Sequence, residues 1–186
     1  MKKTIAALYF TCVCMSCFVN DIKLYEAEQA AKRNNPQRAI ALYQSVDENL
    51  EDPVIAYNCA VLYAELKEYQ AALNVYEKLL KKDIPQRIRI AALYNAAHIL
   101  FEKKHYADAI VLLREALLIT QDEAVLMLYQ CSLTQLDPGT GVSALTEMSG
   151  VIGAHEAKTE ALLFTPVPYG ILFPGENTTS EQVMDY

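Results

Sequence analysis

The sequence predicts an all-α fold, built as a solenoid of repeated helix pairs with an irregular C-terminal tail. The first observation is a recurring apolar pattern, which stands in the segments PQRAIALYQSV (36–46), EYQAALNVYEKLL (68–80) and HYADAIVLLREAL (105–117). Aligned on Ala39, Ala72 and Ala109, these segments are 33 and 37 residues apart. Periods of this size are typical of solenoids, in which one unit cannot bury its apolar face alone and neighbouring units cover each other.

The second observation is a stretch of helical periodicity ahead of each pattern, in YEAEQAAK, YNCAVLYAELK and YNAAHILFEKK. Each stretch has a small residue twelve positions before its aligned alanine, namely Ala27, Ala60 and Ala97. A small residue lets two helices approach closely, while larger residues three and four positions away fill the remaining space. Each unit is therefore predicted to be a pair of packed helices.

Capping signals place the ends of these helices. Asn35 before Pro36, and Asp52 before Pro53, each combine an N-cap residue with a first-turn proline. The longer 37-residue spacing comes from extra residues around IPQRIRI, which we expect to add nearly a turn to the front of the next helix. We expect helices near 21–34, 36–49, 53–66, 69–82, 86–103, 106–119, 122–136 and 140–149.

The repeated residues resemble those of the tetratricopeptide repeat family. The second unit matches the family's recurring positions with Ala60, Tyr63, Ala72, Tyr76 and Leu79. The third matches them with Leu93, Ala97, Leu100, Ala109, Leu113 and Ala116. The first unit is looser, and a fourth, which carries the turn Asp137-Pro138-Gly139, is degenerate. The resemblance implies a right-handed α-α superhelix of three clear repeats and one degenerate repeat, near 20–52, 53–86, 90–123 and 125–150.

The family's fold also implies a concave groove that binds a protein or peptide with an apolar segment. The groove positions are occupied by Leu24, Tyr57, Asn58, Val61, Tyr94, Asn95, His98, Phe101, Tyr129 and Gln130. Tyrosine offers a large contact area at low entropic cost, and side-chain amides can hydrogen-bond a peptide backbone. We therefore expect Tyr57, Tyr94 and Tyr129 to anchor a partner. The alternative is a groove filled by the protein's own residues 160–174.

The residues of this groove exclude one mode of binding that the family uses. Co-chaperones of the family that grip C-terminal carboxylates place Lys, Asn, Asn, Lys and Arg at fixed groove positions, of which this sequence matches only Asn58. Without cations to pair with a carboxylate, that mode of binding is excluded.

Cys59 and Cys131 fall at equivalent positions two units apart, so we expect two small core residues and no disulfide between them.

The first 19 residues resemble a bacterial export signal. Two lysines precede an uncharged apolar run from Thr4 to Val19, which is short for a spanning helix of about 20 residues. The run resembles a lipoprotein signal with lipidation at Cys17 after Ser16, although Cys14 and Met15 depart from the usual pattern. An ordinary signal peptide or an uncleaved membrane anchor are the alternatives. Residues 151–186 form a separate tail, apolar but interrupted by prolines.

Several classes of function are disfavoured by composition. A net charge of −7 without a basic stripe argues against nucleic-acid binding. The three histidines are widely spaced, no phosphate-binding glycine loop occurs, and no metal-ligand pattern stands outside the leader. We therefore expect no catalytic residues, no metal, no cofactor and no enzymatic activity.

The resulting hypothesis is a non-enzymatic adaptor of the tetratricopeptide type. The leader places it in the bacterial cell envelope or periplasm, attached to the membrane by the leader or a lipid, and the resemblance implies a role in envelope assembly or secretion. The alternative is a cytoplasmic chaperone of translocator-type secreted proteins, which would use the same groove to shield an apolar client segment. Homo-oligomerisation and the identity of the partner stay open, since such scaffolds host many functions.

Overall fold

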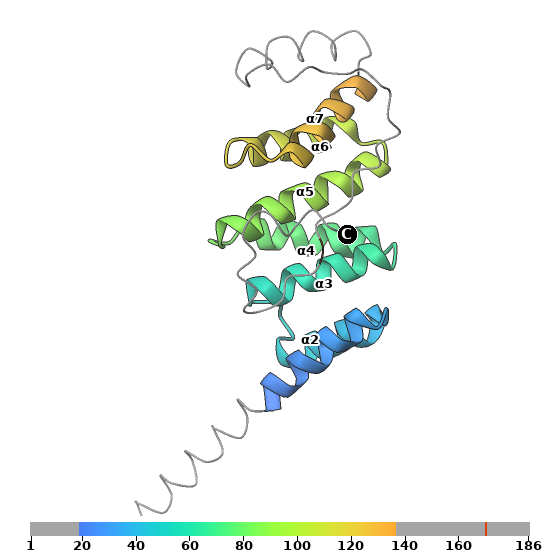
Figure 1. Ribbon diagram of the computed structural model, residues 1–186, viewed down its shortest axis with the longest axis vertical. Coiled ribbons are helices and arrows are strands. Elements are labelled where there is room, and N and C mark those ends of the chain that lie inside the picture. The colour runs from blue at the N-terminus through green and yellow to red at the C-terminus, as the bar shows by residue number, and fades with distance from the viewer. Residues whose placement is uncertain (1–18, 137–169, 171–186) are drawn as a thin grey trace, which may run out of the picture. The chain divides into compact units, whose positions relative to one another are not determined.

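The computed structural model describes residues 19–136 and Gly170 (Figure 1). All regular structure within these residues is α-helical, so the predicted fold class is confirmed. A helix over residues 19–32, here the N-terminal helix, is followed by α2 (Pro36–Val46), α3 (Pro53–Glu65), α4 (Tyr69–Leu80), α5 (Gln86–Glu102), α6 (Tyr106–Leu117) and α7 (Glu123–Leu136). The predicted helices between residues 21 and 136 are all present, with ends that differ by at most three residues. The predicted helix at 140–149, residues 1–18 of the leader, and the C-terminal tail apart from Gly170 lie outside the described residues.

The described residues form two compact units that divide within α4, after Val75. In the first unit α2 packs against α3. Its core contains small side chains that permit this close packing together with larger apolar ones: Ala27, Ala30, Ala39, Ile40, Tyr43, Ile55, Cys59 and Leu62. The small residues that marked the repeat in the sequence are therefore core residues, as the helix-pair interpretation requires.

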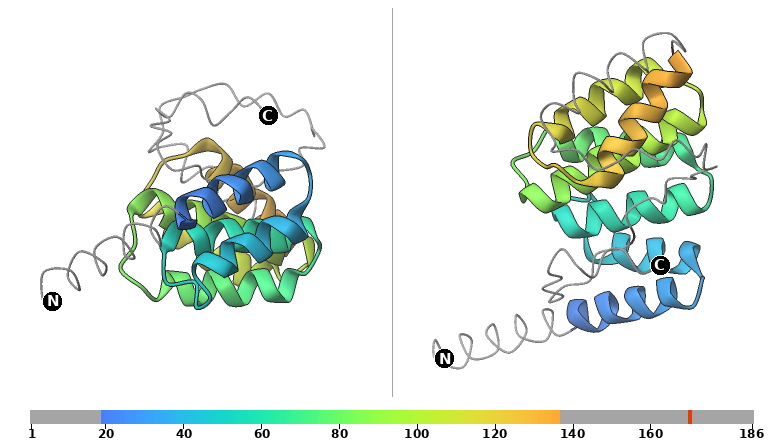
Figure 2. Two further views of the ribbon diagram at one scale, coloured as in Figure 1. Left: turned by 90° about the horizontal axis from the view of Figure 1, so that it is seen from below. Right: turned by 45° about the horizontal axis from the view of Figure 1, so that its top comes forward.

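In the second unit α6 packs against both α5 and α7, and α5 also contacts α7 (Figure 2). The shared core is formed by Leu93, Tyr94, Ala97, Ala109, Leu113, Ala116, Val125 and Leu128. The helix α5 has 17 residues against 13 in α3, so the longer repeat spacing is accommodated as about one extra turn at the front of α5. This confirms the prediction made from IPQRIRI.

First and second helices of a repeat differ in how they are buried. Every residue of α3 from 55 to 62 is buried, and so is every residue of α5 from 91 to 97. By contrast, α2 buries only Ala39, Ile40 and Tyr43, and α6 only Ala109, Leu113 and Ala116. A helix that is buried on all sides must have neighbours all round, whereas a helix with one apolar stripe has neighbours on one side and water on the other.

One turn geometry recurs between the two helices of each repeat. Asn34, Lys67 and Lys104 each stand five positions before an aligned alanine, and their φ angles are 56°, 61° and 62°. The N–H of Lys104 donates to the carbonyl of Phe101 (2.9 Å), and the N–H of the next residue, His105, donates to that of Leu100 (2.8 Å). Equivalent bonds form at the other two turns. These are Schellman motifs, which satisfy the last carbonyls of a helix and turn the chain into the next one.

None of the helices within residues 19–136 combines the length and the apolar character needed to cross a bilayer.

Candidate functional site

The first unit holds four of the predicted groove residues. Leu24 is half-buried and packs against the core of this unit. Tyr57, Asn58 and Val61 of α3 are buried, with Tyr57 fully so. These side chains therefore contribute to packing, and the structure provides no exposed tyrosine at position 57.

Asn58 and Asn95 were predicted to bond a partner's backbone, but their amides are used inside the fold. The Nδ2 of Asn58 donates to the Oη of Tyr43 at 3.4 Å, and the Nδ2 of Asn95 donates to the Oη of Tyr76 at 3.3 Å. Both bonds link the first helix of a repeat to the second helix of the repeat before it. Because an unsatisfied buried amide would cost about 1–3 kcal/mol, each pair gives its asparagine a structural role that sequence position alone did not reveal.

Burial also affects the acid–base behaviour of these tyrosines. It raises the pKa of Tyr43 to about 12, while the hydrogen bond from Asn58 acts in the opposite direction. Burial likewise raises the pKa of Tyr94 to about 12, with a smaller contribution from the nearby Asp122 carboxylate. These phenols are neutral at physiological pH and act as apolar surfaces with a hydroxyl group.

The asparagine–tyrosine pair is not repeated at the next junction. The position equivalent to Tyr43 and Tyr76 is Leu113, which has no hydroxyl group, and the position equivalent to the asparagines is Gln130. Gln130 is half-buried, and no residue of 19–136 hydrogen-bonds its side-chain amide. Within residues 19–136, nothing therefore competes with a ligand for the amide of Gln130. The absence of a tyrosine at position 113 is the sequence signal for this difference.

The aromatic groove residues of the second unit lie on α5 and α7. Tyr94, His98 and Phe101 are spaced to share one face of α5. Tyr94 is buried, whereas His98 and Phe101 are half-buried. The ring centroids of Tyr94 and His98 are 6.5 Å apart. The rings of Phe101 and Tyr106 pack edge to face, with their centroids 5.4 Å apart.

Tyr129 of α7 is half-buried and packs, with Phe101, against the same core. The structure packs Phe101 and Tyr129 against one core, and His98 and Gln130 are the other partly exposed predicted groove residues on the contacting helices α5 and α7. We call these four residues the α5–α7 face. Such a face can hold an apolar side chain by aromatic contact and a peptide group through the glutamine amide.

The two internal cysteines are free: Cys59 is buried and Cys131 is half-buried. Burial raises the pKa of the Cys59 thiol to about 12, and burial also raises the pKa of Cys131. Since the thiolate is the nucleophilic form, burial lowers the reactivity of both thiols. The predicted lipidation site, Cys17, lies outside the described residues.

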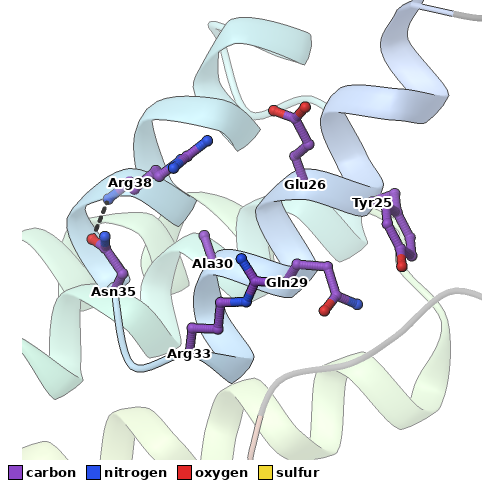
Figure 3. A pocket seen from close by; sticks show the side chains of 7 residues that line it. All are labelled: Tyr25, Glu26, Gln29, Ala30, Arg33, Asn35 and Arg38. Atoms are coloured by element: carbon purple, nitrogen blue, oxygen red, sulfur yellow. Dashed lines mark hydrogen bonds between the residues drawn. The ribbon is translucent and has the colours of Figure 1, made fainter.

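A pocket of about 320 Å³ lies on the first unit, at residues that the sequence analysis did not select as a site (Figure 3). It is formed by the N-terminal helix and the start of α2, and its lining is Tyr25, Glu26, Gln29, Ala30, Arg33, Asn35 and Arg38. The Oδ1 of Asn35 caps α2 by accepting from the N–H of Arg38 at 3.3 Å. A weak sequence signal exists, because four of the five cationic residues between 19 and 75 lie within 23–38.

Consecutive helix pairs with small residues at their crossings, joined by the same turn, define a tetratricopeptide-type α-solenoid. Comparison with solved structures supports this class: two chains of MamA, "MamA 41-end from Desulfovibrio magneticus RS-1" and "MamA RS-1 ArsTM double mutant", each match with a TM-score of 0.59. Each is 19% identical in sequence, and each match covers 72% of this chain and 75% of the MamA chain. No family model matches the sequence, and no curated protein matches it. At this identity the likeness establishes the fold.

Proposed function

We propose that this chain is a protein-binding scaffold whose α5–α7 face holds an apolar segment of a partner. The observation that carries the proposal is the Gln130 amide, which has no hydrogen-bond partner among the described residues and stands on the helix that presents the half-buried Tyr129. Tetratricopeptide-type solenoids offer such faces without chemistry of their own, so binding is the activity that this fold and these side chains support best.

The geometry favours a partner segment with a large apolar side chain and an accessible backbone. Phe101 and Tyr129 supply aromatic surface that is already positioned by packing against the core, which lowers the entropic cost of binding. Gln130 can donate to a peptide carbonyl and accept from a peptide N–H. Tyr57 and Asn58 are buried and are not part of the proposed contact surface.

Site-specific photo-crosslinking of the full-length chain in its own cells tests this proposal. A benzophenone amino acid at Phe101 should give a discrete crosslinked product, whereas one at Val111, which is exposed on α6, should not. The partner identified in this way should then bind the purified chain about tenfold or more weakly after Gln130→Ala or Tyr129→Ala, as expected for residues central to an interface. Equal crosslinking at both positions, or unchanged affinity in both variants, would contradict a role for this face.

The cellular context is a second part of the proposal. The leader sequence supports an envelope-attached adaptor with a lipid on Cys17, serving assembly or secretion; the alternative is a cytoplasmic chaperone for secreted clients. Intact mass and cell fractionation of the chain, with and without Cys17→Ala, distinguish them. A mature chain that begins at Cys17 with added acyl mass, absent in the variant, supports the adaptor. A full-length chain in the cytoplasm supports the chaperone.

A further inference from the structure

We infer that the pocket lined by Arg33 and Arg38 is a second docking site, which takes a carboxylate side chain of an acidic partner segment flanked by apolar residues. This site belongs to the first unit and shares no residue with the α5–α7 face. The two proposals can therefore fail independently.

The shape of the pocket follows from the local secondary structure. Tyr25, Glu26 and Gln29 come from one face of the N-terminal helix, because they are spaced by about one turn or less, and Arg33 follows the last residue of that helix. Asn35 and Arg38 come from the turn and from the first turn of α2. The buried Ala30 lies between these groups, and Figure 3 shows the polar side chains arranged around it. Its small methyl group leaves the space that the pocket occupies.

The charges in the pocket point to a carboxylate. Neither Arg33 nor Arg38 forms an ion pair with any residue of the described chain. Two guanidinium groups and one carboxylate, that of Glu26, leave the lining with one net positive charge in a protein whose total charge is −7. Guanidinium groups match a carboxylate in a bidentate geometry, and the N-terminal end of α2 adds positive potential nearby.

The exposed apolar side chains beside the pocket indicate what flanks that carboxylate. Tyr25, 62% exposed, lines the pocket, and Val19 and Ile22 precede it at three-residue intervals, each 43% exposed. These three side chains form an apolar row along the N-terminal helix that leads to the arginines. A segment that alternates acidic and apolar side chains complements both features. A nucleic acid or free phosphate would meet Glu26 and would gain nothing from the apolar row, so we favour a protein segment.

Selection of twelve-residue peptides from a random displayed library, against the full-length chain, tests this inference. The enriched peptides should carry Asp or Glu next to an apolar residue. Their affinity should fall about tenfold after Arg33→Gln or Arg38→Gln, since the charge-assisted hydrogen bonds between the guanidinium group and the peptide carboxylate are lost. The matched control is Arg114→Gln, which changes an exposed arginine of α6 and should leave the affinity unchanged.

A variant that should strengthen peptide binding distinguishes a binding role of the pocket from a structural one. Glu26→Gln removes the one negative charge from the lining and should tighten peptide binding severalfold at low salt. The proposed site would be contradicted if the selected peptides were not enriched in acidic residues, or if neither arginine variant changed their affinity. Displacement of the peptide by millimolar phosphate would reassign it to a simple anion. Tighter peptide binding after neutralising Glu176, Glu181 and Asp185 together would show that the chain's own acidic residues occupy the pocket and would overturn the choice of a partner protein.

Discussion

Arg89 of α5 holds the end of α4 through its guanidinium group. Its Nη1 donates to the backbone carbonyl of Leu80 at 3.1 Å, and its Nη2 donates to that of Lys82 at 2.8 Å. Leu80 is the last residue of α4, where carbonyl groups have no partner within the helix. One cationic side chain on the added turn of α5 thus supplies the C-terminal cap of the preceding helix.

Removing this cap should destabilise the protein. We expect Arg89→Ala to lower the free energy of unfolding by about 1.5–3 kcal/mol, because two hydrogen bonds from a charged, partly buried donor are lost. Glu115→Gln is the control, since its carboxylate lies 3.8 Å from Arg89 and is half-exposed, and it should change stability by less than about 0.5 kcal/mol. Urea unfolding followed by circular dichroism measures both. Equal effects of the two variants would assign the role of Arg89 to its ion pair.

The buried pair of Tyr43 and Asn58 gives a second prediction. Tyr43→Phe removes only the hydroxyl group and should cost about 0.5–1.5 kcal/mol of unfolding free energy. Tyr106→Phe is the matched control, because no described residue hydrogen-bonds the Tyr106 hydroxyl, and it should be nearly neutral. If both variants were equally stable, the 3.4 Å contact would contribute nothing to the junction.

The recurring turn gives a prediction of increased stability. Lys104 adopts a positive φ that costs a residue with a Cβ about 1–2 kcal/mol, a cost that glycine avoids. Allowing for the greater freedom of glycine in the unfolded chain, we expect Lys104→Gly to stabilise the protein by about 0.5–1 kcal/mol. Lys78→Gly, in the last turn of α4, should have the opposite effect of about 1 kcal/mol. Thermal unfolding of both variants checks the sign, and a destabilised Lys104→Gly would contradict the assignment of the turn.

Stability should decrease at alkaline pH. The pKa values of Tyr43 and Tyr94 are raised to about 12 in the folded chain, so these groups ionise more readily after unfolding. Their contribution is complete below their ordinary pKa of about 10 and is lost as the pH rises towards 12. The Cys59 thiol, whose pKa is also raised to about 12, starts to contribute to this loss of stability at about pH 9. Urea unfolding at pH 8, 9.5 and 11 should show the decrease, and it should be smaller in Tyr43→Phe.

The periodic features of the fold could be predicted from the sequence. Alanines at fixed spacing and apolar residues at helical intervals report directly on packing, and Asn35 and Asp52 mark helix starts by a local hydrogen bond. The repeat turns were harder to predict because Asn34, Lys67 and Lys104 are not glycines. Only the backbone bonds of the turn show why these residues have positive φ angles.

The site was only partly predictable, because the position of a residue in the repeat does not show whether its side chain is buried. Asn58 and Asn95 occupy the same position as Gln130, yet they are buried and bonded to tyrosines while Gln130 is half-buried. The residue equivalent to their tyrosine partners is Leu113, which has no hydroxyl group to accept a hydrogen bond. The arginine pocket was missed for a similar reason, since Arg33 stands in the turn and Arg38 on α2, and they line one pocket only after the chain turns.

The extra turn of α5 has a consequence for how such a chain tolerates changes in length. Asn58 follows Tyr43 by 15 residues and Asn95 follows Tyr76 by 19, yet the two donor–acceptor distances differ by only 0.1 Å. The four added residues correspond to about 400° of helix rotation, close to one full revolution, and they precede the bonded asparagine. The chain ahead of the bonded asparagine can therefore differ in length by one turn while the hydrogen bond between successive repeats is kept. Inserting four residues between Arg89 and Asn95 should preserve the direction in which Arg89 points, whereas inserting two residues there would turn it by about 200°, away from α4.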